Sequence, residues 1–229
     1  MGHLQKAIRR IKTRYRNRQA TKAIVSTGFW FIDIPRTSST SIRAELGKKF
    51  GPIHGKRNVI ESEHATEQVL PEHLSAHEMQ AITGADAWDE LYSFSIVRNP
   101  FERLLSFYNY MQKCGDLPSD WSYTEFVARL VEATPKTPYL GYFGLRRTAC
   151  DFVLDAEGKQ LVTEIFHFEN RAEAITRIGQ KIGFPDLGKL HVQTASPKGQ
   201  DYRLAHDDKT RALLEDFYAR DLAYFGYRF

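Results

Sequence analysis

The order of apolar and polar positions predicts a strand followed by a helix near the start of the chain. Phe29–Ile34 (FWFIDI) is short, aromatic and rich in isoleucine, which is typical of a buried strand. Pro35 ends this strand, because proline has no N–H to donate inside a central strand. A helix is expected from about Thr40, and its apolar side chains recur four residues apart: Ile42, Leu46 and Phe50.

A second strand and helix repeat this arrangement further along the chain. Tyr92–Val97 predicts another buried strand. Asn99 as N-cap, Pro100 at the first helical position and Glu102 at the third indicate the start of a helix. We expect this helix to run to about Gln112, so that a strand, a polar loop and a helix follow one another twice.

Between the two units lies a predicted helix with two histidines at its start. Ser75 and Glu78 have the spacing of a capping box, and the helix is expected to extend to about Thr83. His73 falls just outside its first turn, whereas His77 falls inside it.

The second half of the chain predicts further helices and one hairpin. Thr124–Val131 is expected to be helical, and Asp151–Leu154 with Gln160–Phe168 is expected to form a small antiparallel hairpin. Two later helices are indicated by their apolar positions: Ala172, Ile175, Ile178 and Ile182 in one, and Leu213, Leu214, Phe217 and Leu222 in the other. Strands that alternate with helices favour an α/β fold with a mainly parallel central sheet flanked by helices.

Composition favours a single globular domain behind a basic leading segment. The chain has 229 residues and 42% hydrophobic composition, which is enough for one substantial core. Residues 1–22 hold eight Lys or Arg and no acid, and are expected to be helical; the domain, 23–229, keeps 24 basic and 28 acidic residues. A basic lead of this kind can touch membrane phosphates or an anionic polymer weakly, but it is more often solvated.

Cysteine usage and hydropathy bear on the compartment. Cys114 and Cys150 are too few for a disulfide framework and are not spaced as a metal site. No run of about 18 apolar residues and no signal-peptide core is present. The sequence therefore predicts a cytoplasmic protein, with membrane association through residues 1–22 as an open alternative.

The first loop combines one cation with a row of hydroxyl groups between a strand and a helix N-terminus. Unpaired backbone N–H groups and the helix dipole favour an anion there, and an arginine can neutralise its charge. A Walker A loop relies on the same physics, but its glycines and lysine are missing. A helix cap rich in serine and threonine explains the loop equally well. The candidate anion-binding residues are Arg36, Thr37, Ser38, Ser39, Thr40 and Ser41.

The second loop begins with Arg98, directly after the strand Tyr92–Val97. Ligands bind outside the carboxyl ends of strands in open α/β sheets, so Arg98 can hold a second phosphate with Ser106 on the following helix. The alternative is a surface ion pair for Arg98 and an ordinary helix position for Ser106.

Together the two loops resemble the paired motifs of the sulfotransferases that use 3′-phosphoadenosine 5′-phosphosulfate (PAPS), particularly the carbohydrate branch. In that family a loop of the form P-K-T-x-S-T-S binds the 5′-phosphosulfate, and R-[DN]-P-x-x-R-x-x-S-x-Y binds the 3′-phosphate. The resemblance spans roughly residues 29–229 and implies a P-loop-like sulfotransferase fold. It assigns the first role to Arg36–Ser41 and the second to Arg98 and Ser106, with Arg36 in place of the usual lysine.

The same resemblance implies a general base and no metal. A histidine some 20 to 25 residues before the 3′-phosphate arginine corresponds to His73, which lies 25 residues before Arg98, or to His77, which lies 21 before it. His73 is the preferred base, because a residue just before a helix can face the site, and ordinary surface histidines are the alternative. Arg36 is the candidate for stabilising charge on the leaving oxygen.

Two later segments also resemble family landmarks. They are Phe168–Asn170, where Asn170 can simply cap the next helix, and Tyr218–Phe229. A basic loop with Lys198 and Arg203 is expected to bind the nucleotide or to be an ordinary solvated loop.

The sequence thus predicts sulfuryl transfer from PAPS to a hydroxyl, most plausibly on a saccharide. An ATP-dependent phosphotransferase is the enzymatic alternative, although no carboxylate pair for magnesium is evident. A basic protein that binds an anionic polymer is the alternative from another class, although no nucleic-acid module is recognised.

Overall fold

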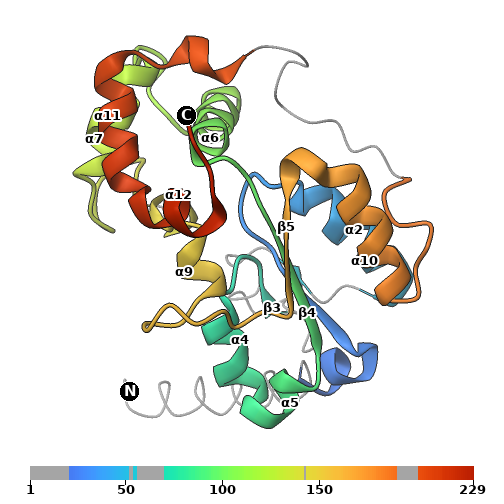
Figure 1. Ribbon diagram of the computed structural model, residues 1–229. Coiled ribbons are helices and arrows are strands. Elements are labelled where there is room, and N and C mark those ends of the chain that lie inside the picture. The colour runs from blue at the N-terminus through green and yellow to red at the C-terminus, as the bar shows by residue number, and fades with distance from the viewer. Residues whose placement is uncertain (1–20, 52–53, 56–69, 142, 190–200) are drawn as a thin grey trace, which may run out of the picture.

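The computed structural model describes residues 21–51, 54–55, 70–141, 143–189 and 201–229 (Figure 1). Three parallel strands form the main sheet in the order β1 (Phe29–Ile32), β4 (Tyr92–Val97) and β5 (Glu164–His167). Two short strands, β2 (His54–Gly55) and β3 (Leu70–Pro71), pair in parallel as a separate sheet. The α/β class with a parallel central sheet is therefore confirmed.

Helices connect and flank the strands, beginning with a helical segment at residues 21–27. The helices before β5 are α2 (Ser39–Phe50), α4 (Ala76–Thr83), α5 (Ala85–Asp89), α6 (Pro100–Cys114), α7 (Tyr123–Val131), α8 (Phe143–Arg146) and α9 (Cys150–Val153). After β5 come the 3₁₀ turn η1 (Phe168–Asn170), α10 (Arg171–Lys181), η2 (Tyr202–Ala205), α11 (Asp208–Phe217) and α12 (Ala219–Phe225).

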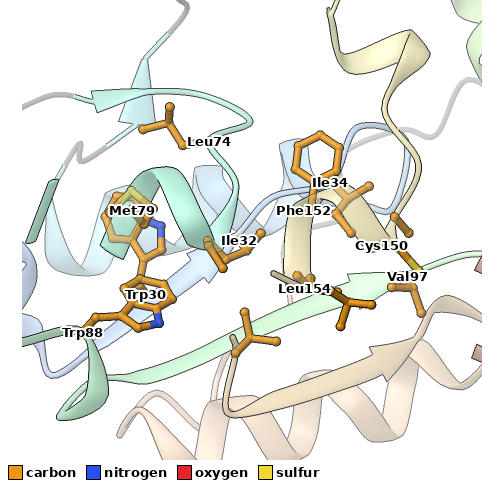
Figure 2. Packing of buried hydrophobic residues seen from close by; sticks show 14 of the residues in the cluster. Trp30, Ile32, Ile34, Leu74, Met79, Trp88, Val97, Cys150, Phe152 and Leu154 are labelled. Atoms are coloured by element: carbon orange, nitrogen blue, oxygen red, sulfur yellow. The ribbon is translucent and has the colours of Figure 1, made fainter. Parts of the chain in front are cut away.

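Strands β1 and β4 are buried on both faces, whereas β5 is half-buried. Successive side chains of a strand point to opposite faces of the sheet. Phe29 and Phe31 pack with apolar residues of α2 and α10. Trp30 and Ile32 face the other way and pack with residues of α4, α5 and α9, among them Met79 (Figure 2). Burial on both faces explains why the first strand is an unbroken apolar run rather than an alternating one.

Helices α6, α7, α11 and α12 lie together beside the sheet (Figure 1). A third apolar cluster holds them together. Phe101 and Leu104 of α6 pack with Phe126 of α7 and with Leu214 of α11. The start of α6, at the edge of the sheet, is therefore fixed by packing against the C-terminal helices.

The parallel register brings three loops to one edge of the sheet. Ile32 pairs with Ser95, and Val97 pairs with His167, so the carboxyl ends of all three strands lie together. The segments that leave this edge are residues 33–38, 98–99 and 168–170.

Predictions that depended on local signals are confirmed. The Ser75 hydroxyl accepts from the Glu78 N–H at 3.2 Å, and the Glu78 carboxylate accepts from the Ser75 N–H at 2.8 Å, which completes the capping box of α4. Asn99 caps α6, with its side-chain oxygen 3.1 Å from the Phe101 N–H. Helix α7 begins at Tyr123, one residue before the expected start.

The predicted antiparallel hairpin is wrong. Cys150–Val153 forms the helical turn α9, and only one antiparallel bridge, between Leu154 and Gln160, remains of the pairing. The Asp221 carboxylate accepts from the N–H groups of Ala149 and Cys150 at 2.6 and 2.8 Å. This cap from a distant residue stabilises a helical turn in an apolar run that fits a strand equally well.

The last helix along the chain was predicted as one helix, but the structure has two. Helices α11 and α12 meet at Tyr218, whose backbone leaves the helical region with φ −104° and ψ 17°. Its side chain is 1% exposed and belongs to the third apolar cluster, so the bend places the ring in the core. Over the described ranges, no helix is long and apolar enough to cross a membrane.

Candidate functional site

The loop after β1 presents an uncapped helix N-terminus. Arg36 and Ser38 have left-handed φ values of 69° and 71°, and the Thr37 hydroxyl donates to the Ile34 carbonyl at 2.8 Å. Ser38 is the N-cap of α2, but its side chain makes no cap hydrogen bond. The first N–H groups of α2 have no acceptor within the helix itself, which is the arrangement that binds anions.

Arg98 lies beside this loop. Its Nη1 donates to the Arg36 carbonyl at 3.2 Å, its Nη2 lies 2.5 Å from the Glu102 carboxylate, and its guanidinium lies 4.3 Å from the centre of the Phe168 ring. The side chain is 7% exposed, and its Nε is buried without a hydrogen-bond acceptor in the part of the chain that is described. A buried donor of this kind calls for an explanation, and a bound anion supplies one.

The two predicted loops meet through Arg36 and Ser106. Nε and Nη2 of Arg36 both donate to the Ser106 hydroxyl, at 3.1 and 3.0 Å, across 70 residues of sequence. The Arg36 guanidinium also lies 4.7 Å from the centre of the Tyr110 ring. Burial lowers the pKa of Arg36, and the positive charge of Arg98 lowers it further. Two neighbouring cations of this kind favour a negatively charged ligand.

Arg103, the arginine of α6, fixes the backbone of the first loop. Arg103 is 2% exposed, and its Nε donates to the Pro35 carbonyl at 3.1 Å. Its Nη atoms donate to the Arg147 carbonyl. Arg103 therefore ties α6 to the loop through main-chain oxygens and does not depend on a ligand for its partners.

The two candidate bases have different surroundings. His73 is buried and has φ 61°. Its backbone N–H donates to the Asp33 carboxylate at 2.8 Å. Its Nδ1 lies 2.7 Å from the Asp33 carbonyl, which can only accept, so Nδ1 is the donor in this contact and Nε2 takes no part in it. Arg43 pairs with Asp33 at 3.2 Å on the other side. His77 is exposed in the first turn of α4.

The other predicted residues are placed as follows. Ser39 and Ser41 are buried at the start of α2, whereas Thr40 is exposed. Arg203 pairs with Asp201 at 3.3 Å and stacks on Tyr202, so its contacts lie outside the first loop. Lys198 lies outside the described residues.

Three contributors were given no role at the site from the sequence. Arg171 Nε donates to the Ser38 hydroxyl at 3.0 Å, although 133 residues separate them. The Glu169 carboxylate accepts from the Asn99 N–H at 2.9 Å and from the Tyr227 hydroxyl at 2.8 Å. Burial raises the pKa of Tyr227, and the negative charge of Glu169 and this hydrogen bond raise it further. The motif Phe168–Asn170 marked the position of Glu169, but no sequence signal pointed to Arg171.

The site's chemistry is therefore cationic and rich in N–H donors. Among the described residues, no cluster of three His, Cys, Asp or Glu side chains is placed to hold a metal ion. The arrangement suits a negatively charged ligand that meets the α2 N-terminus and the arginines beside it.

The comparisons with known proteins agree with this geometry. The model of the sulfotransferase family matches residues 26–228, which is nearly the whole chain. No curated protein and no solved structure matches with significant similarity. Because the family model covers both loops and the sheet that positions them, the chain belongs to the sulfotransferase family.

Proposed function

We propose that this sulfotransferase takes its sulfuryl group from PAPS and transfers it to a hydroxyl group, with a carbohydrate as the acceptor class. The observation that carries the proposal is the contact of Arg36 with Ser106 beside Arg98 and the uncapped start of α2. These groups come from the two loops to which the family resemblance assigns the two ends of the donor.

The donor's charge fits the residues present. PAPS carries a 3′-phosphate and a 5′-phosphosulfate, so it needs two anion sites at some distance from each other. The α2 N-terminus with Arg36 would hold the 5′ side, and Arg98 with Ser106 would hold the 3′-phosphate. Anions at these places would offset the repulsion that lowers the pKa of Arg36 and give the buried Arg98 Nε an acceptor.

Three side chains have the chemical properties that the transfer needs. PAPS supplies a sulfuryl group whose S–O bond to the 5′-phosphate breaks as the acceptor oxygen bonds to sulfur. Arg36 would stabilise the negative charge that remains on the phosphate oxygen. His73 would take the acceptor proton on Nε2, because Nδ1 is engaged by the Asp33 carbonyl. Arg43 and Asp33 would keep the His73 backbone and ring in place.

A thermal-shift titration tests the donor. Adenosine 3′,5′-bisphosphate (PAP) at about 100 times its dissociation constant should stabilise the folded protein by about 2.7 kcal/mol. ADP, and ATP with magnesium, are the parallel ligands. A shift that only the 3′-phosphorylated nucleotide produces supports PAPS, whereas a preference for ATP with magnesium would point to phosphoryl transfer and contradict the proposal.

Arg98→Ala tests the 3′-phosphate site. We expect the variant to bind PAP more weakly by about 1–3 kcal/mol, the range for losing hydrogen bonds to a charged group, as measured by isothermal titration calorimetry. Arg129→Ala is the matched control, because Arg129 also pairs with a glutamate four residues away and stacks on an aromatic ring, Trp121. Equal affinities in both variants and the unaltered protein would remove Arg98 from the site.

The acceptor class needs its own assay. We expect sulfate transfer from PAPS to soluble saccharides, measured by mass spectrometry of the products, to exceed transfer to simple phenols. The reverse order would leave PAPS as donor and overturn the carbohydrate assignment.

A further inference from the structure

Arg171, the first residue of α10, contacts the anion-binding loop from the other side of the site. Its Nε donates to the Ser38 hydroxyl at 3.0 Å. The described residues offer no carboxylate partner to its guanidinium, in contrast with Arg177 of the same helix, which pairs with Glu164. A cation is thus held beside the start of α2 without an acidic partner in the described structure.

This place is electrostatically unfavourable for a cation when no ligand is bound. The N-terminus of a helix carries partial positive charge, so an arginine at the first position of α10 is disfavoured by its own helix. Ser38, which Arg171 contacts, is the N-cap of α2, a second helix N-terminus. Arg36 and Arg98 add two more positive charges to the same loop. Together these groups favour the binding of a strongly anionic group.

The serine that Arg171 contacts does not cap α2 with its side chain. A serine at an N-cap ordinarily accepts a hydrogen bond from the N–H two or three residues later. Here the Ser38 hydroxyl accepts from Arg171 instead, and the Ser38 backbone is left-handed with φ 71°. The first N–H groups of α2 are therefore left for a ligand.

A separate observation points to an anionic ligand next to this loop. The Arg98 side chain is 7% exposed, and its Nε is buried without an acceptor in the described ranges. Because Arg98 Nη1 donates to the Arg36 carbonyl, the 3′-phosphate assigned to Arg98 would bring the donor nucleotide to the loop that Arg171 reaches through Ser38.

We propose that Arg171 is a third arginine of the donor site and binds the 5′-phosphosulfate end of PAPS directly. This inference rests on the proposed function, because it assumes that the loop before α2 receives the 5′ side of the nucleotide. Arg171 donates to the same anion as the α2 N–H groups, while Arg98 and Ser106 serve the 3′-phosphate.

Calorimetric titration with two probes, PAP and adenosine 3′-phosphate, separates the two ends of the nucleotide. Arg171→Gln should weaken PAP binding about ten- to a hundredfold, as expected for losing a charged hydrogen-bond donor, and should leave adenosine 3′-phosphate binding unchanged within about threefold. Arg171→Lys keeps the charge without the planar fork, so its affinity for PAP should lie between those of the unaltered protein and Arg171→Gln. Arg177→Gln removes one positive charge from the same helix and should change neither affinity.

A positioning role through Ser38 makes a different prediction. If Arg171 acted only by holding the Ser38 hydroxyl, Ser38→Ala would lose as much PAP affinity as Arg171→Gln, and the double variant would lose no more. That result would overturn the inference and leave the proposed function standing. The same holds if Arg171→Gln binds PAP with unchanged affinity, or if it weakens the binding of both probes equally. If the unaltered protein bound no PAP, the proposed function itself would fail, and this inference with it.

Discussion

Arg36 stands where the sulfotransferase motif ordinarily has lysine, and its contacts explain how the larger cation is accommodated. Two of its N–H groups converge on one oxygen, that of Ser106, while its plane lies against the Tyr110 ring. A lysine ammonium has neither a planar face nor two donors in a fixed fork. Arg36 thus connects the two predicted anion sites in a way that the usual lysine would not.

Arg36→Ala should reduce turnover more than it reduces donor binding. If the guanidinium stabilises charge that develops on the phosphate oxygen, its loss should lower kcat by about 10²–10³. Arg36→Lys should retain more of the rate, because the charge remains. Steady-state kinetics at saturating PAPS, with PAP affinity from calorimetry, measure both quantities. An unchanged kcat with weakened PAP binding would make Arg36 a binding residue only.

His73→Ala and His77→Ala should differ sharply. His73 is buried with Nδ1 on the Asp33 carbonyl, and the loss of a general base should lower turnover by about 10²–10⁴ with PAP affinity retained. His77 is exposed on α4, so its substitution should leave turnover nearly unchanged. Full activity in His73→Ala would move the base elsewhere.

At the scale of elements, the turn η2 joins α11 to the core through a histidine in an aromatic box. The His206 ring makes edge-to-face contacts with Phe101, Tyr123 and Phe229 at centroid distances of 5.5, 5.0 and 5.6 Å. Both ring nitrogens are buried, and neither makes a hydrogen bond of normal geometry among the described residues, although the nearby Phe101 backbone favours the protonated ring. Burial lowers the pKa of His206 to about 4. The box therefore holds a neutral imidazole at physiological pH.

This histidine should make the fold sensitive to acid. An unfolded histidine takes up its proton near pH 6.5, so between pH 6.5 and about 4 the unfolded state binds more protons than the folded one. Stability is therefore kept above pH 6.5 and falls as the pH drops toward 4. His206→Phe should reduce this fall. The midpoint temperature of unfolding should therefore drop less between pH 7.5 and pH 5 in the variant than in the unaltered protein. Parallel pH profiles of the two proteins in thermal denaturation would contradict the assignment.

At the scale of the whole molecule, Asn99 connects three segments that are far apart in sequence. Its side-chain oxygen caps α6, and its Nδ2 donates to the Tyr202 hydroxyl at 3.1 Å and to the Arg228 carbonyl at 2.8 Å. Its backbone N–H bonds the Glu169 carboxylate, which also receives the Tyr227 hydroxyl. The turn that carries Arg98 is thus held by the C-terminal residues as well as by the sheet.

Asn99→Asp separates the capping role from this connecting role. Aspartate caps a helix as well as asparagine does, but it cannot donate to Tyr202 or Arg228. We expect the free energy of unfolding in urea to fall by about 1–3 kcal/mol, because the partly buried hydrogen bond to the Arg228 carbonyl loses its donor. Asn170→Asp is the matched control, since Asn170 stands at the N-cap of α10 without a side-chain cap bond. Equal stability of the two variants would mean that the connections to Tyr202 and Arg228 contribute nothing.

The parts of the fold that sequence predicted are those that local chemistry decides. Strand Tyr92–Val97, the capping box of Ser75 and Glu78, and the cap at Asn99 each depend on residues within a few positions of one another. The hairpin expected from Asp151–Leu154 with Gln160–Phe168 failed for the opposite reason, because Asp221, about 70 residues away, caps α9 as a helical turn.

The candidate site divides in the same way. Residue order and spacing alone are enough to predict the strand–loop–helix units, the position of Arg36 and Arg98 after the strands, and the family motifs. The folded chain is needed to show that Arg36 contacts Ser106, that Arg171 contacts Ser38, and that Glu169 contacts Asn99. These contacts join residues 70 to 133 positions apart. The packing of the parallel sheet and its helices brings them together, so no local pattern in the sequence can encode them.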